Sequence, residues 1–130
     1  MLDVVVSPAA RTCAEPMPDI SQAVAVAETL LAESGFADAE VSVLLVNDAE
    51  IHALNQKWRG YDKPTDVLSW PLEDSPIPGE TVALGDVVIS LDTAYRQAQK
   101  RGWSDAEEIA LLLVHGILHL LGYEDRKSVV

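Results

Sequence analysis

Two histidines near the end of the chain have the spacing of a metal-binding pair. They are His115 and His119, in the segment V-H-G-I-L-H-L-L-G-Y-E-D of residues 114–125. On an α-helix, residues four apart project from one face, about one turn from each other. Two imidazoles placed in this way can bind a single metal ion, as they do in the H-x-x-x-H half of zinc hydrolases. The spacing therefore predicts a metal site on a helix.

Asp125 is the predicted third ligand of this site. Gly122 is expected to end the helix and to permit a sharp turn, which would bring the carboxylate of Asp125 back toward the histidines. Two histidines and one carboxylate leave a fourth tetrahedral position for water, which is typical of a catalytic zinc site rather than a structural one. Glu124 is adjacent and also acidic, so it stays open as the alternative ligand.

A structural role is the alternative for the two histidines themselves, since imidazoles on an apolar helix can be hydrogen-bonded core residues. Burying two imidazoles without partners is costly, which favours metal binding. In zinc proteases of the H-E-x-x-H type, the residue after the first histidine is a glutamate that acts as general base. Here that position holds Gly116, which argues against a peptide hydrolase of this type.

Composition indicates one globular domain. The chain has 130 residues, of which 48% are hydrophobic and 23% charged, and its formal net charge is −12. An acidic chain lacks the general electrostatic footprint of a nucleic-acid-binding protein, so any such role needs a local basic patch. A single cysteine, Cys13, excludes an internal disulfide framework and favours a reducing, cytoplasmic setting.

Neither end of the chain predicts membrane insertion. The N-terminus lacks the basic region of a signal peptide, and the longest apolar stretch, Ile109–Leu121, is too short to span a bilayer. No feature of the sequence sets an oligomeric state.

Hydrophobic periodicity predicts alternating strands and helices. We expect strands at residues 2–6, 40–46, 65–70 and 82–90, and helices at 20–34, 47–58, 92–100 and 104–121. Loops are expected at 7–18, 59–64 and 72–81, where proline and glycine gather. The predicted fold class is α+β (mixed α/β): a single small domain with about four strands, and helices around the central helix that bears the metal site.

Three blocks of the sequence resemble the YbeY family of bacterial endoribonucleases. His115–Tyr123 matches the family pattern H-G-x-L-H-L-x-G-Y-[DE], and Leu54–Trp70 is similar to L-N-x-x-[YW]-R-x-x-x-x-P-T-[DN]-V-L-S-[FW]. Leu84–Ser90 is similar to the strand L-G-D-[IV]-x-I-S. The resemblance runs from about Val41 to Tyr123 with consistent order and spacing.

The resemblance implies a function as well as a fold. It implies a zinc-dependent endoribonuclease that prefers single-stranded RNA, with ribosomal RNA and small-subunit ribosomal components as partners and no membrane. His115 and His119 would be metal ligands for one zinc ion per chain, and Arg59 would be the catalytic arginine, suited to meet a phosphate. Without the resemblance, a solvated loop cation is the alternative for Arg59. A ribosome-assembly module with a structural metal is the second functional hypothesis, and a hydrolase of another substrate is the third.

The chain departs from the family pattern at its C-terminal end. Relatives usually have a third histidine at the position of Asp125, and they continue with an acidic tail where this chain has five more residues. A carboxylate ligand lowers the net charge of a zinc site, which makes the metal a weaker Lewis acid. We therefore expect a single YbeY-like metallohydrolase domain over residues 1–130 with a shortened C-terminal tail.

We also expect Trp58, Trp70 and Trp103 to lie mostly in the core.

Overall fold

The computed structural model of the chain describes residues 1–11, 17–72 and 75–123. These residues form four strands and five helices in a mixed α/β order, which confirms the predicted fold class. In chain order the elements are β1 (Leu2–Val6), α1 (Pro8–Arg11), α2 (Ser21–Glu33), β2 (Glu40–Val46), α3 (Asp48–Arg59), β3 (Val67–Pro71), β4 (Ala83–Ser90), α4 (Leu91–Arg101) and α5 (Asp105–Leu120).

The strands form one sheet in the order β1-β2-β4-β3. β1, β2 and β4 are parallel, and β3 pairs antiparallel to β4 at one edge. Because side chains alternate between the two faces of a strand, neighbouring residues of β3 point to opposite faces of the sheet. This edge strand therefore contributes side chains to both faces.

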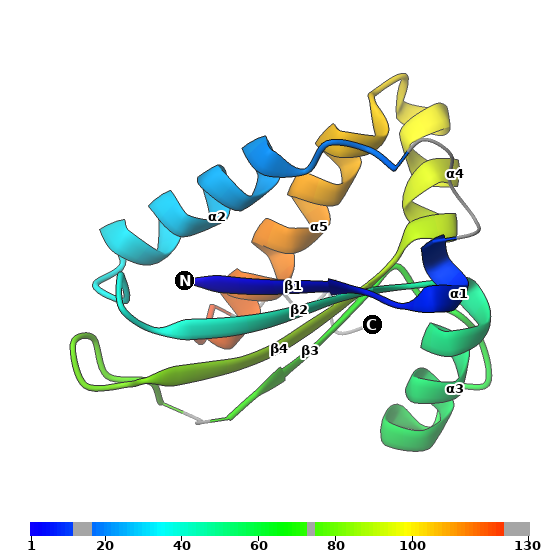
Figure 1. Ribbon diagram of the computed structural model, residues 1–130. Coiled ribbons are helices and arrows are strands. Elements are labelled where there is room, and N and C mark those ends of the chain that lie inside the picture. Colours follow the sequence, from blue (N-terminus) through cyan, green and yellow to red (C-terminus); the bar gives the residue numbers. More distant parts are fainter. Residues whose placement is uncertain (12–16, 73–74, 124–130) are drawn as a thin grey trace.

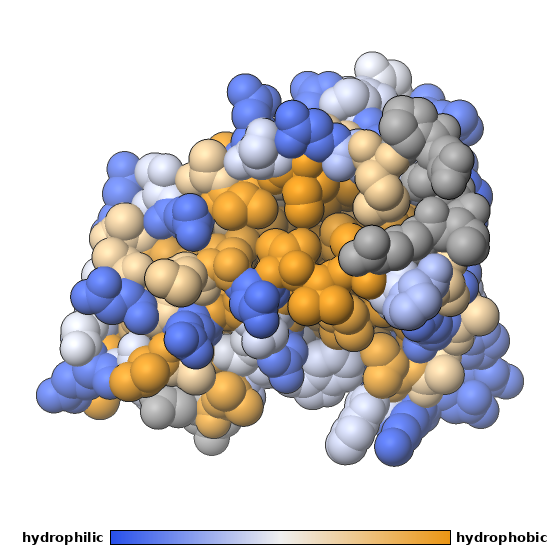
Figure 2. All heavy atoms as spheres, viewed as in Figure 1, coloured by the Kyte–Doolittle hydropathy of each residue, from blue (hydrophilic) through white to orange (hydrophobic). Residues whose placement is uncertain are grey.

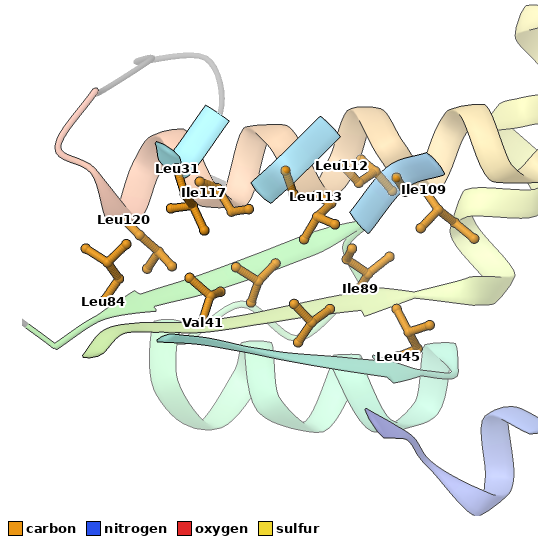
Figure 3. Close-up of a cluster of buried hydrophobic side chains, with 14 of the residues drawn as sticks. Leu31, Val41, Leu45, Leu84, Ile89, Ile109, Leu112, Leu113, Ile117 and Leu120 are labelled. Atoms are coloured by element: carbon orange, nitrogen blue, oxygen red, sulfur yellow. The ribbon is translucent and has the colours of Figure 1, made fainter. Parts of the chain in front are cut away.

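Helices cover the two faces unequally. α2 and α5 lie side by side over one face, and α3 lies against part of the other (Figure 1). The main core lies between the first face and its two helices. Figure 3 shows its side chains converging there from Leu31 of α2, from α5 residues that include Ile109 and Ile117, and from the strands. A smaller cluster lies under α3 and contains the buried residues Val46, Ile51, Leu68 and Val88.

Hydrogen bonds at the helix starts explain why the helices begin where they do. Asn47 with Glu50, and Ser104 with Glu107, form capping boxes at the starts of α3 and α5. Ser90 caps α4 by accepting a hydrogen bond from the backbone N–H of Thr93. These caps fix α3, α4 and α5 directly to the ends of the preceding strands or turn.

The segment 7–18, predicted to be a loop, contains a short helix instead. α1 begins at Pro8, and the Ser7 hydroxyl accepts a hydrogen bond from the backbone N–H of Ala10 at 3.1 Å. Proline is favoured at the first position of a helix because its missing N–H has no partner to lose there. The proline that suggested a loop therefore starts a helix.

The tryptophans lie nearer the surface than predicted. Trp58 is 60% exposed, Trp103 is 43% exposed and Trp70 is half-buried, so the expectation that they lie mostly in the core is wrong. On the face seen in Figure 2, hydrophobic side chains gather instead in the middle, where β1 and α2 lie, with hydrophilic ones around them. Within the part of the chain that the structure describes, no helix is long and apolar enough to cross a membrane.

Candidate functional site

The two predicted ligands lie on α5, one turn apart. The helix buries Ile109, Leu112 and Leu113 in the main core, and this packing fixes which of its side chains remain at the surface. His115 is exposed and His119 is half-buried. The histidines are therefore accessible to a ligand, and the alternative in which both are core residues does not hold for His115.

Gly116 lets α5 approach the sheet closely between the two histidines. A Cβ atom built at this position would lie 2.7 Å from Val87 Cγ1 and 3.1 Å from Val87 Cγ2. Since Val87 is fully buried and β-branched, its side chain cannot move aside easily. The glycine that replaces the general base of zinc proteases thus has a packing role in this fold.

Ser69 of β3 holds the imidazole of His119. The Ser69 hydroxyl and His119 Nδ1 form a hydrogen bond. If Nδ1 carries the proton and donates, the lone pair on Nε2 remains for a metal ion; this is the usual arrangement of a metal-binding histidine, which donates its other N–H to a neighbouring acceptor. Sequence reasoning missed Ser69, although the alternation along β3 could have placed it on the face toward α5.

The third ligand lies outside the described residues, and so does its alternative. The prediction for Asp125 and for Glu124 is therefore untested by the structure. Within residues 1–11, 17–72 and 75–123, no group of three or more His, Cys, Asp or Glu side chains is close enough to hold a metal ion. The described residues thus supply two imidazole donors, and one of these is oriented by a hydroxyl group. This donor set fits zinc, which binds imidazole nitrogen well.

Arg59 lies in a basic and aromatic surface at the end of α3. Its guanidinium carbon is 5.3 Å from the centre of the Tyr61 ring, and Lys63 Nζ is 5.8 Å from the same ring. Lys57 Nζ lies 5.2 Å from the centre of the Trp58 ring. We call these five residues the α3 basic patch. It is the kind of local positive surface that an acidic chain needs if it is to meet a phosphate.

Arg59 and the histidines belong to helices on opposite faces of the sheet, but both helices end at the same part of it. On one face, the Leu120 side chain of α5 lies next to Gly85 of β4. On the other face, Trp58 of α3 lines a groove together with Asp86 of β4. The structure therefore places His115 and His119 one turn apart on one helix, and Arg59 at the end of a helix on the opposite face of the sheet.

The fold and the site define a class: a small mixed α/β protein with a histidine pair on a helix that packs against an antiparallel edge strand. Comparison with known proteins gives the family. The sequence model of the family described as Endoribonuclease YbeY matches residues 13–129, and the chain belongs to this family.

Several curated relatives named Endoribonuclease YbeY are about half identical to the chain. The protein from Anaeromyxobacter sp. (strain Fw109-5) is 52% identical over 101 residues, which cover 78% of this chain and 52% of that relative. The protein from Persephonella marina is 48% identical over 101 residues, which cover 78% of this chain and 66% of the relative. The chain thus spans between half and two thirds of the length of these relatives.

A solved structure supports the fold independently. The solution structure of the protein TM1509 from Thermotoga maritima is 27% identical to the chain and superposes with a TM-score of 0.59. The match covers 98% of this chain and 78% of that protein. The architecture described above is therefore shared with an experimentally determined structure.

Proposed function

We propose that this chain is a zinc-dependent endoribonuclease that prefers single-stranded RNA and acts in ribosomal RNA processing and ribosome maturation in the cytoplasm. Its proposed partners are ribosomal RNA and small-subunit ribosomal components. Membership of the Endoribonuclease YbeY family supports the class of reaction. The observation that carries the proposal is the pair His115 and His119 one turn apart on α5, the first exposed and the second half-buried, with the His119 ring held by Ser69.

The proposed roles follow from the chemistry of each side chain. His115 and His119 would bind the zinc ion, together with Asp125 or Glu124. When bound, zinc supplies Lewis-acid polarisation of a phosphoryl oxygen or of a water molecule. Ser69 would keep the His119 ring in the orientation and tautomer that binding needs.

Arg59 would stabilise the negative charge that grows on the phosphate. A guanidinium group binds phosphate oxygens through two parallel N–H donors, and an interaction of this kind is strongest where charge develops in the transition state. Lys57 and Lys63 would attract the RNA backbone to the same surface against the −12 net charge of the chain. This role requires the reacting phosphate itself to lie at the β3 edge, within reach of both Arg59 and the histidine pair, since α3 and α5 lie on opposite faces of the sheet.

The same separation favours a second candidate function. In a non-catalytic ribosome-assembly module, the metal would secure the C-terminal turn and the α3 basic patch would dock on RNA independently of it. The two candidates differ in whether Arg59 and the histidines act in one reaction.

Cleavage of a single-stranded RNA by three variants distinguishes these candidates. For an endoribonuclease, His119→Ala abolishes cleavage and metal content together, whereas Arg59→Ala lowers the cleavage rate about a hundredfold or more and leaves metal content unchanged. Arg59→Lys is the matched control, because it keeps the charge and loses the two-pronged donor. If RNA binds but neither the unsubstituted chain nor the variants cleave it, the assembly module is correct.

A further inference from the structure

A groove crosses the face of the sheet that α3 leaves partly uncovered. Its volume is about 580 Å³, within the range of small-ligand sites. The floor consists of strand residues of the sheet, and α3 contributes Leu54 and Trp58 as one wall. In Figure 2 the groove lies on the lower side of the molecule, where the outline is indented beside α3.

Two cross-strand rows of side chains form most of this floor. The strand register aligns Val5, Leu44, Val88 and Leu68 in an apolar row. It aligns Asp3, Ser42, Asp86 and Trp70 in a second, mostly polar row. Leu44, Val88 and Leu68 of the apolar row belong to the small cluster under α3 or pack against it. Asp3, Ser42 and Asp86 of the polar row are exposed. The groove thus presents hydrogen-bonding groups beside an aromatic ring.

The polar row mainly offers acceptors. Asp86 is the direct register partner of Trp70, so its carboxylate lies beside the indole, and Asp3 adds a second carboxylate two strands away. Ionised carboxylates accept hydrogen bonds and donate none. A flat ring stacked on Trp70 or Trp58 would therefore be bound best if its edge carried two adjacent N–H donors.

Phosphate contacts lie next to this groove rather than inside it. Trp58, which lines the groove and is 60% exposed, has Lys57 Nζ 5.2 Å from its ring, and Arg59 and Lys63 follow at the end of the same helix. A neutral base can enter the groove while its phosphate stays on the α3 basic patch. This division of charge suits a nucleotide, and it avoids the repulsion that the two carboxylates would exert on a phosphate.

We propose that the groove is a subsite for one unpaired guanine of the RNA substrate. The guanine ring stacks against Trp58 and Trp70, and its N1–H and N2–H groups donate to the Asp86 carboxylate. Among the four RNA bases, guanine has adjacent ring and amino donors on its Watson–Crick edge that match a carboxylate in two places. The proposal rests on the proposed endoribonuclease function, to which it adds a base preference.

The arrangement also relates this subsite to the histidines. Ser69 and Trp70 are neighbours on β3, and they point to opposite faces of the sheet: Ser69 toward His119 and Trp70 toward the groove. A single RNA strand that bends around this edge would place its guanine in the groove, one flanking phosphate on the α3 basic patch and the other flanking phosphate near α5.

Nucleotide titrations of the metal-free chain test the subsite without depending on catalysis. The probes are guanosine, inosine and adenosine monophosphates, and binding is followed by the NMR signals of the indole N–H groups of Trp58, Trp70 and Trp103. We expect guanosine monophosphate to shift the signals of Trp58 and Trp70 and to leave that of Trp103 unchanged. Inosine monophosphate lacks the N2 amino group and should bind roughly tenfold more weakly.

Two substitutions assign the contacts. Asp86→Asn should abolish the preference for guanosine over adenosine monophosphate, because an amide presents only one acceptor oxygen. Trp58→Ala should weaken binding of every nucleotide roughly tenfold, whereas Trp58→Phe retains a stacking ring and most of the affinity. Trp58 is largely exposed, so neither substitution of this residue should destabilise the fold.

The possible contradictory results are distinct from a failure of the proposed function. If the three nucleotides bind equally, or if Asp86→Asn leaves the preference intact, the guanine subsite is wrong even when the chain cleaves RNA. If a lysine-rich peptide shifts the Trp58 and Trp70 signals and no nucleotide does, the groove is a protein-docking site instead. If guanosine monophosphate binds as described and the chain cleaves no RNA, the subsite stands and the nuclease function fails.

Discussion

Ser69 Oγ of the edge strand and His119 Nδ1 of the last helix are joined by a hydrogen bond, across 50 residues of sequence. This bond links the antiparallel strand β3 to the end of α5, where the two helix histidines lie. It gives His119 a fixed ring orientation before any ligand arrives. Histidines that bind metals are commonly held in this way by a second hydrogen bond.

Removing the Ser69 hydroxyl should weaken metal binding and leave the fold intact. We expect Ser69→Ala to lower zinc affinity roughly tenfold to a hundredfold, because the His119 ring loses its orientation. Competition with a chromophoric chelator measures the affinity. Ser69→Thr is the matched control, since it keeps the hydroxyl group. Equal zinc affinity for Ser69→Ala and the unsubstituted chain would show that the bond has no part in a metal site.

Gly116 should be intolerant of any side chain. Gly116→Ala places a Cβ atom against Val87, and overpacking of this kind costs about 1–3 kcal/mol. The better helix propensity of alanine returns about 1 kcal/mol, so the variant should be destabilised by about 1 kcal/mol. Urea unfolding measures the difference. The double variant Gly116→Ala with Val87→Ala should lose less stability than the two single changes added together, and strict additivity would contradict the proposed contact.

Glu108 should make stability depend on pH. The Glu108 side chain on α5 is fully buried, and this burial raises the pKa of its carboxyl group. Arg101, whose Nε lies 3.1 Å from Glu108 Oε1, acts against this and lowers the pKa, whereas the charge of Asp66 raises it further. Because the folded pKa is raised, the stability contributed by Glu108 is complete below the ordinary pKa and is lost as pH rises through the raised one. Glu108→Gln should therefore increase the free energy of unfolding by about 1 kcal/mol near neutral pH and by much less near pH 4.

Glu107 lies on the same turn of α5 and is a control, because its carboxyl pKa is shifted in the opposite direction. Its hydrogen bond from the Ser104 backbone N–H, together with the bond to the Ser104 side chain, lowers the pKa of the Glu107 carboxyl. Its contribution is therefore present above the ordinary pKa and lost as pH falls through the lowered one. Glu107→Gln should destabilise the chain near neutral pH and have little effect in acid. If the two variants show the same pH dependence of unfolding, the buried environment of Glu108 is not the cause.

The third ligand can be identified by two substitutions. Asp125→His introduces the imidazole that the family resemblance implies at this position, and it should tighten zinc binding and raise nuclease activity. Asp125→Ala should weaken zinc binding, because two imidazoles alone hold the ion poorly. Zinc affinity and cleavage rate are measured together. If Glu124→Ala weakens zinc binding and Asp125→Ala does not, the ligand is Glu124.

Local sequence signals predicted most of the elements because each has a local physical cause. The helices predicted from residues 47 and 104 begin within one residue of α3 and α5, where Asn47 and Ser104 form capping boxes. The strand predicted at 65–70 ends one residue later, at Pro71. The histidine pair was predicted because its spacing is a property of a single helix. Contacts between distant segments leave no such signal, so the bond from Ser69 to His119 and the approach of Gly116 to Val87 required the structure.

The position of Arg59 could not be predicted for the same reason. The sequence places Arg59 after a helix and before a strand, but it does not say which face of the sheet that helix covers. The structure places α3 and α5 on opposite faces of the sheet. The exposure of Trp58 follows from this placement. Because α3 covers only part of one face of the sheet, the last turn of the helix, which carries Trp58, lies beside the groove.

Reconstitution of the metal-free chain with zinc tests the central claim most directly. The chain is freed of metal with a chelator, zinc is added in steps, and cleavage of a single-stranded RNA is measured at each step. We predict that the metal-free chain does not cleave RNA, and that the rate rises in proportion to zinc until each chain holds one ion and then stays constant. Full cleavage by the metal-free chain, or by the His115→Ala and His119→Ala double variant, would contradict the account.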